Sequence, residues 1–137
     1  MKLAILTTLL AGLATPAFVG DLTLDLSTRA SGGRIAVAVY RDAAAFRRGE
    51  GPVVSRMVER TGAVTTVVID GLPPGRYAVA SFHDTDNNGD LTLWPIGLPR
   101  EAYGFSRDAR GRFGPPTFDA AAFDLPASGA RQAIRLH

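Results

Sequence analysis

The sequence lacks cysteine and holds little lysine and histidine, and each shortage removes a class of chemistry. With no cysteine among 137 residues, disulfides, thiolate metal sites and cysteine nucleophiles are excluded. Lys2 is the single lysine, which leaves no phosphate-binding or Schiff-base lysine in the body of the chain. The two histidines, His83 and His137, are too few for a three-histidine metal site. Any metal would therefore rely mainly on oxygen ligands.

The chain also lacks a strong excess of charge of either sign. Lysine and arginine number 15 against 13 acidic residues, a formal net charge of +2, and most arginines are interleaved with acids. Nucleic-acid binding favours clustered positive charge, so we expect no nucleic-acid partner. Apolar residues make up 46% and charged residues 20%, which is typical of a folded globular domain.

A long apolar run occurs once, at the N-terminus. Lys2 precedes apolar residues 3–13, and small residues follow at 14–17. This pattern predicts a secretory signal peptide over 1–17, cleaved after Ala17; the alternative is a buried N-terminal helix. The run is too short to span a bilayer. We therefore expect residues 18–137 to form a single domain, secreted or periplasmic, with no transmembrane anchor after cleavage.

The remaining pattern predicts an all-β fold. Residues 21–27 alternate strictly, with Leu22, Leu24 and Leu26 on one face. Further strands are expected at 34–41, 53–60, 63–69, 77–82 and 131–136, with turn chemistry at 70–75 and single helical turns within 42–46 and 117–123. About seven short strands predict an antiparallel β-sandwich. The strand at 34–41 carries Ala36, Ala38 and Tyr40 opposite its apolar face, so both of its faces can be covered.

Residues 83–126 are rich in Gly, Pro and aromatic residues. This composition predicts a long insertion without strands. A connection of this length is usually functional, or is organised by a ligand or an ion.

The insertion begins with His-Asp-Thr-Asp-Asn-Asn-Gly-Asp at 83–90, which contains the first half of a calcium loop, D-x-D-x-N-G. Side-chain oxygens of Asp84, Asp86 and Asn88 can converge on one ion, and Asp90 would add its backbone carbonyl. An EF-hand needs a glutamate at the twelfth position, where this chain has Pro95, so another carboxylate must close the site. Glu101 is the nearest in sequence; Asp108 and Asp119 are the others. The competing interpretation is a solvated hairpin turn without an ion.

Aromatic residues recur later in the insertion. Trp94, Tyr103, Phe105 and Phe113 lie among glycines and prolines. One interpretation is an aromatic groove that binds a small ligand or carbohydrate, with Arg100, Arg107 or Arg112 contacting anions. The other is that these rings fold back on the sheet as a satellite core.

His83 has three possible roles. It can hydrogen-bond a loop carbonyl and pin the loop, contact a metal or ligand, or act as the base of a hydrolase beside Asp84. The G-x-S-x-G motif of many hydrolases is absent, because the segment Gly104–Asp108 lacks the final glycine. Structural pinning is the favoured interpretation.

Four stretches carry a family resemblance. They are Gly-Leu-Pro-Pro-Gly-Arg-Tyr-Ala-Val at 71–79, Phe-His-Asp at 82–84 with Asn88-Gly89, residues 97–106, and residues 113–118. In combination they resemble the signature of the bacterial family called domain of unknown function 2141, over about residues 20–137. The resemblance implies an exported protein of Gram-negative bacteria with no established activity. This chain departs from the pattern at 85–87, which adds an acid to the turn, and at Trp94-Pro95.

A weaker, architectural resemblance lies at residues 70–77. Asp-Gly-Leu-Pro-Pro-Gly-Arg-Tyr is similar to the turn and strand of transthyretin-like and Ig-like sandwich modules, which supports the fold and does not identify a function.

Together these features predict an exported periplasmic or cell-envelope β-sandwich without a catalytic role. We expect it to bind Ca²⁺ at the Asp/Asn-Gly loop, for structure or to bind an envelope partner. The alternatives are a module that binds a small ligand or carbohydrate and a hydrolase that uses His83.

Overall fold

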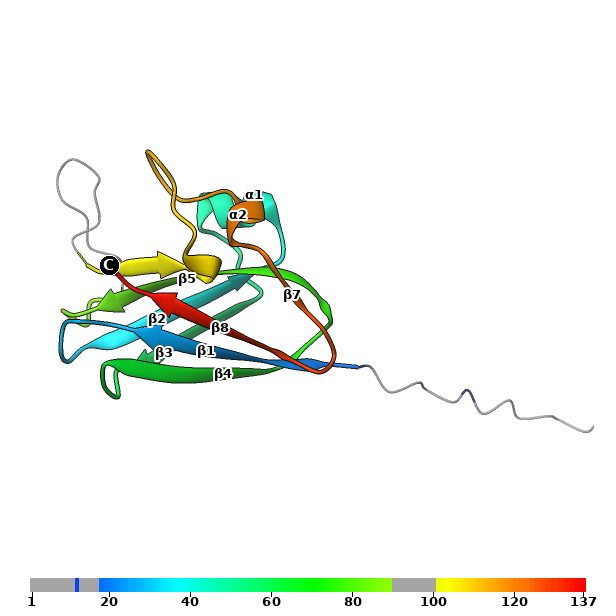
Figure 1. Cartoon of the computed structure of the whole chain (residues 1–137), viewed down its shortest axis with the longest axis horizontal. Helices are drawn as coiled ribbons and strands as arrows, with labels where there is room; N and C mark the ends of the chain where they lie inside the picture. Colours follow the sequence, from blue (N-terminus) through cyan, green and yellow to red (C-terminus); the bar gives the residue numbers. More distant parts are fainter. Residues whose placement is uncertain (1–11, 13–17, 90–100) are drawn as a thin grey trace, which may run out of the picture.

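Two β-sheets packed face to face make up the described part of the chain, residues 12, 18–89 and 101–137 of a computed structural model (Figure 1). One sheet has the order β4–β1–β8 and the other the order β3–β2–β5–β6, with β7 paired to the start of β5. The prediction of an all-β sandwich is confirmed. The strands are β1 (Gly20–Ser27), β2 (Arg34–Tyr40), β3 (Val54–Glu59), β4 (Val64–Leu72), β5 (Gly75–Asp84), β6 (Tyr103–Phe105), β7 (Phe123–Leu125) and β8 (Ala130–Arg135).

Strand alternation places one face of each sheet in the core. Leu22, Leu24 and Leu26 of β1 are fully buried, as their spacing predicts. Each such side chain stabilises the fold by roughly 1.5–3 kcal/mol relative to an exposed position. Strands β4 and β8 of the same sheet, together with β2 and β5 of the facing sheet, contribute further residues to this core: Val67, Ile69, Ile134, Ile35, Val37, Val39, Tyr77 and Val79.

Strand β1 joins its sheet through two different kinds of pairing. It is antiparallel to β4 and parallel to β8, with Leu24 opposite Val67 on one side and Gln132 on the other. Parallel neighbours need a long connection, and here nearly the whole domain lies between the two strands. The other strand pairs that the structure describes are antiparallel.

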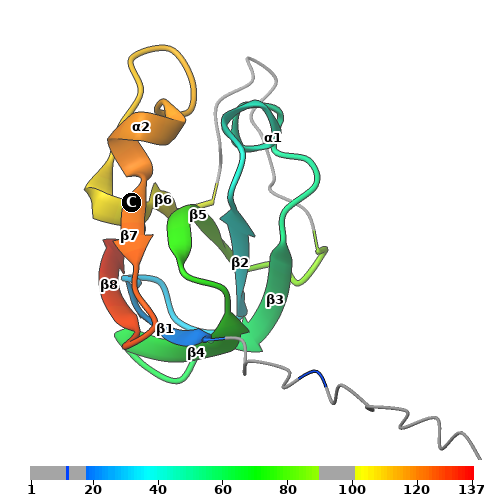
Figure 2. The ribbon, with the colours of Figure 1, turned by 90° about the vertical axis from the view of Figure 1, so that its right-hand side faces the viewer.

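Two short helices cover one end of the outer face of the five-stranded sheet (Figures 1 and 2). Helix α1 (Ala43–Arg48) begins at its N-cap Asp42, whose carboxylate accepts the backbone N–H of Ala45 at 3.1 Å. Helix α2 (Phe118–Ala121) lies beside it, and the Phe46 and Phe118 rings meet edge to face at 6.0 Å. Both expected helical turns are therefore confirmed. Within the described ranges, no helix combines the length and the apolar character needed to cross a membrane.

The prediction that residues 83–126 hold no strands is wrong. Strand β5 continues to Asp84, and β6 and β7 lie inside the insertion. A 3-10 turn follows β6, and helix α2 precedes β7. Strands of three residues are too short to show an alternating pattern. The 3-10 turn η1 (Ser106–Asp108) ties the insertion to the sheet, because the buried Ser106 Oγ accepts the Val79 N–H at 2.9 Å and donates to the Ala121 carbonyl.

The expected turn at 70–75 is also shorter than predicted, because β4 runs on to Leu72. Gly71 permits this extension, since its φ of 71° lies in the left-handed region that glycine adopts without strain.

Gly104 allows β6 to cross closely over β8. A Cβ at this position would lie 2.5 Å from the Arg135 carbonyl oxygen, which is backbone and cannot rotate away. We expect Gly104→Ala to lower the free energy of unfolding by roughly 1–3 kcal/mol. Gly62→Ala is the matched control, because a Cβ there meets no atom within 4 Å. Urea denaturation checks this, and equal stability of the two variants would contradict it.

Asp25 links β1 to both neighbouring strands and gives the fold a dependence on pH. Hydrogen bonds from Arg131 and Thr66 hold the pKa of its carboxyl below the ordinary value. A depressed pKa adds stability above the unfolded-state value, and that stability is lost as pH falls through the native value. The free energy of unfolding should therefore fall less steeply below about pH 4 in Asp25→Asn than in the unmodified protein. Urea denaturation at a series of pH values measures this. A fall as steep as that of the unmodified protein would contradict it.

Candidate metal site

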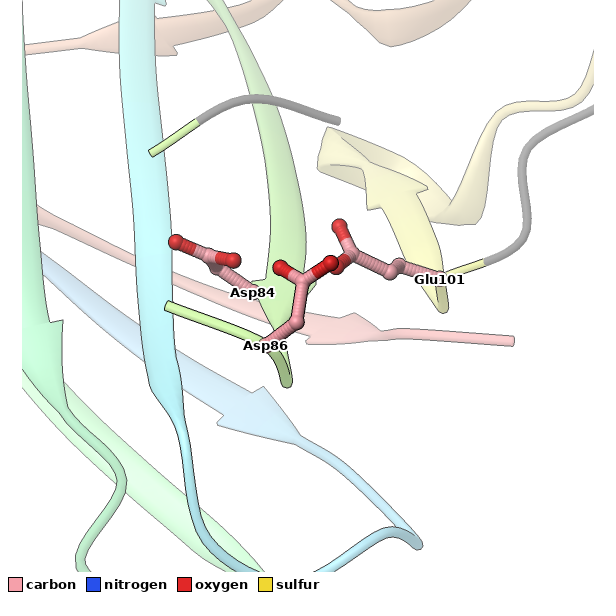
Figure 3. Close-up of side chains that lie close together, drawn as sticks. All are labelled: Asp84, Asp86 and Glu101. Atoms are coloured by element: carbon pink, nitrogen blue, oxygen red, sulfur yellow. The ribbon is translucent and has the colours of Figure 1, made fainter. Parts of the chain in front are cut away.

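Three carboxylates meet where β5 ends and β6 begins. Asp84 is the last residue of β5, Asp86 lies in the following turn, and Glu101 lies two residues before β6. Each offers one oxygen, and these oxygens lie within 4.8 Å of one another (Figure 3). Oxygens bound to one calcium ion at about 2.3–2.6 Å lie at most about 5 Å apart. The spacing therefore suits a single ion.

Sheet register brings Glu101 to this position. Strands β5 and β6 pair with Phe82 opposite Tyr103, and continuing that register by two residues sets Asp84 opposite Glu101. The hydrogen bond from the His83 N–H to the Ala102 carbonyl, at 2.8 Å, extends the pairing toward the cluster. The carboxylates thus come from two separate segments of the chain.

Asp84 is the fixed member of the cluster. Its side chain has no exposed surface, its Oδ1 accepts the Asn88 N–H at 3.1 Å, and its Oδ2 accepts the Gly89 N–H at 2.8 Å. Arg34 on the neighbouring strand β2 places Nη2 at 3.7 Å from Oδ2. A buried carboxylate is tolerated when it is paired and hydrogen-bonded in this way, so its position is set before any ion binds.

The turn after β5 wraps around that carboxylate. Asn87 has a left-handed backbone with φ of 56°, and its Oδ1 accepts the Arg34 Nε–H at 3.2 Å. Asn88 donates its side-chain amide to Asp86 Oδ2 at 3.2 Å. Asn88, whose side-chain oxygen the sequence predicted as a ligand, therefore also orients Asp86 through its side-chain nitrogen.

The cluster brings three carboxylates, those of Asp84, Asp86 and Glu101, close to one guanidinium, that of Arg34. Asp84 and Glu101 are buried, whereas Asp86 is exposed. An exposed carboxylate beside two buried ones leaves one side of the cluster open to water.

The other acids proposed to close the site lie elsewhere. Asp108 accepts the Arg135 backbone N–H at 3.1 Å, and Asp119 pairs with Arg76 at 2.8 Å. Asp90, the predicted carbonyl ligand, lies outside the described residues, as does Trp94.

His83 lies in the core between the sheets. The ring is fully buried, and Nε2 lies 2.6 Å from the Gly32 carbonyl oxygen, so Nε2 carries the proton and donates it. Its Nδ1 has no hydrogen-bond partner among the described residues. The geometry matches the interpretation that His83 pins a loop, here the β1–β2 connection, and the ring lines neither of the cavities described below.

A groove of about 910 Å³ adjoins the cluster on the outer face of the five-stranded sheet. Its floor is formed by Ala36 and Ala38 of β2 and Ala80 of β5. Tyr103 and Phe105 line it as the aromatic interpretation predicted. Phe105 also contacts Phe46 of α1 at 5.8 Å, so the satellite-core interpretation holds for this ring too.

Phe113 differs from these two rings. It is fully exposed and lines neither of these two cavities.

Sequence analysis missed Arg34, which contacts both Asp84 and Asn87. It lies 53 residues from Asn87 in the chain. Only the pairing of β2 with β5, which sets Arg34 opposite Asp84, could have identified it.

The comparisons with known proteins identify a family. The model described as "Uncharacterized protein conserved in bacteria (DUF2141)" matches residues 27–134, a range that takes in most of both sheets and the whole acidic cluster. Neither the curated proteins nor the solved structures contain a significant match.

Proposed function

We propose that this chain, which belongs to the bacterial DUF2141 family, is an exported envelope protein that binds one calcium ion through Asp84, Asp86 and Glu101. The ion would tie the turn after β5 to the start of β6. The observation that carries the proposal is the position of Glu101. A solvated turn requires only Asp84 and its neighbours, whereas Glu101 arrives from a separate segment to face them.

The donor set favours calcium over other divalent ions. The three candidate ligands are carboxylates, the chain has no cysteine, and the His83 ring is directed into the core. Zinc prefers nitrogen and sulfur ligands, and magnesium demands a near-ideal octahedron. Calcium accepts six to eight oxygens in flexible geometry, and the exposed side of Asp86 leaves room for water ligands.

A structural role follows from what the site joins. Asp84 ends the central strand β5 and Glu101 precedes the edge strand β6, so an ion between them would link two neighbouring strands of the five-stranded sheet. Binding energy would then add to folding energy. The signal-peptide pattern at 1–17 supports export, and extracellular calcium modules typically bind with Kd of about 0.1–1 mM.

Thermal unfolding with and without calcium tests this function. At one hundred times Kd, an ion that binds only the native state adds about 2.7 kcal/mol, which raises Tm by several degrees in a domain of this size. We expect Glu101→Gln and Asp86→Asn each to abolish most of this rise. Both leave the Asp84 hydrogen bonds in place, so both should fold.

Asp70→Asn is the control, because this exposed acid on β4 lies outside the cluster. It should retain the full rise in Tm. If calcium raised the Tm of Glu101→Gln as much as that of the unmodified protein, the proposed site would be wrong. If magnesium raised the Tm as much as calcium does, the assignment of the ion as calcium would be wrong.

The groove supports a second candidate function, the binding of a small ligand or carbohydrate. Its alanine floor leaves space on a sheet face that larger side chains would fill, and Tyr103 offers a partly exposed ring for stacking. The groove meets the acidic cluster at Gly89, which lines it and donates to Asp84.

Ligand-observed NMR with a panel of oligosaccharides tests this second function. Ala36→Leu would fill the floor, and we expect it to abolish binding. Ala133→Leu, on an exposed position of β8 in the other sheet, should leave binding unchanged. Absence of binding across the panel, or equal binding by both variants, would contradict the function.

A further inference from the structure

A second cavity lies where the segment after β6 meets the end of β8. It encloses about 160 Å³. Residues that line it and matter for its chemistry are Tyr103, Phe105, Asp108, Arg110 and Arg135. The acidic cluster contributes no residue to it.

The local backbone is held in a costly conformation around this cavity. Arg107 and Asp108 both have positive φ, 60° and 48°, although neither is glycine. A left-handed backbone is unfavourable for residues other than glycine, because the side chain approaches the following carbonyl oxygen. Two hydrogen bonds hold it: Asp108 Oδ1 accepts the Arg135 N–H at 3.1 Å, and Arg107 Nη1 donates to the Ala122 carbonyl at 3.4 Å. The loop is therefore fixed against β8 and α2.

Two guanidinium groups line the cavity. They belong to Arg110 and Arg135, and among the described residues neither lies within 4.0 Å of a carboxylate. Asp108 also lines the cavity, and its carboxylate accepts the backbone N–H of Arg135. Arg110 Nη2 donates to His137 Nε2 at 2.8 Å, which orients the guanidinium and leaves its other N–H groups for a ligand.

We propose that this cavity binds a small organic anion. Its oxyanion group, a phosphate monoester or a carboxylate, lies between Arg110 and Arg135, and a compact apolar part lies against Tyr103 and Phe105. Guanidinium groups bind both oxyanions through paired charge-assisted hydrogen bonds. The arginines differ from those that the sequence suggested: Arg107 is engaged with Ala122, Arg112 lies outside the lining, and Arg100 lies outside the described residues.

Isothermal titration with phenyl phosphate and with benzoate tests the proposal and distinguishes the two oxyanions. We expect saturable binding of at least one of them, with inorganic phosphate weaker because it lacks the apolar part. Arg110→Gln should weaken binding by about tenfold or more, since it removes charge-assisted hydrogen bonds to the oxyanion. Arg110 is exposed, so the variant should fold.

Arg112→Gln is the matched control, because it removes the same charge from the same loop at an exposed position outside the cavity. It should leave the affinity unchanged. An equal loss of affinity in the two variants would show diffuse attraction to surface arginines and overturn the proposal. Absence of saturable binding of both probes at millimolar concentration would overturn it too.

Discussion

The candidate site depends on one buried carboxylate. Asp84 has no exposed side-chain surface, and an unpaired charge in that position would cost several kcal/mol. The chain meets this cost with Arg34 from β2 and with two backbone N–H groups from the turn that follows. These contacts fix the turn after β5. The fixed turn places Asp86 beside Asp84, with both carboxylates directed toward Glu101. Asp84 thus connects the end of β5 with the arrangement of the three carboxylates.

The outer face of the five-stranded sheet is divided into three regions by side-chain size and charge. Successive outward-facing pairs between β2 and β5 are Tyr40 with Ala78, Ala38 with Ala80, Ala36 with Phe82, and Arg34 with Asp84. The first pair lies under the helices, the alanine-rich middle forms the groove, and the last pair belongs to the acidic cluster. Small residues here leave open space that the β-branched residues usual on a sheet face would occupy. The groove therefore ends at the acidic cluster.

Much of the sandwich could be predicted from local pattern. Leu22, Leu24 and Leu26 alternate as a half-buried strand must, and Asp42 marks the start of α1 by its capping chemistry. Strand β6 could not be predicted, because three residues centred on Gly104 carry no period and glycine disfavours strands. Its position depends on β8, which supplies the backbone that Gly104 approaches.

The residues of the acidic cluster could be predicted from the sequence, whereas the way in which the fold brings them together could not. The D-x-D-x-N-G spacing identified Asp84 and Asp86, and nearness in sequence singled out Glu101. Arg34 escaped because a register between strands joins it to Asp84, and register is not visible in a single sequence. The cavity near β8 was missed for the same reason: Arg110 and Arg135 belong to different segments of the chain, and only the fold places both in one lining.

Calorimetric titration of the chelator-treated protein with calcium tests the central claim most directly. The account predicts one site per chain, with heat that disappears when Glu101 is replaced by Gln and persists when Asp70 is replaced by Asn. Glu101 is the discriminating residue because a plain turn does not need it. Titration heat that is unchanged in Glu101→Gln, or the absence of any calcium heat in the unmodified protein, would contradict it.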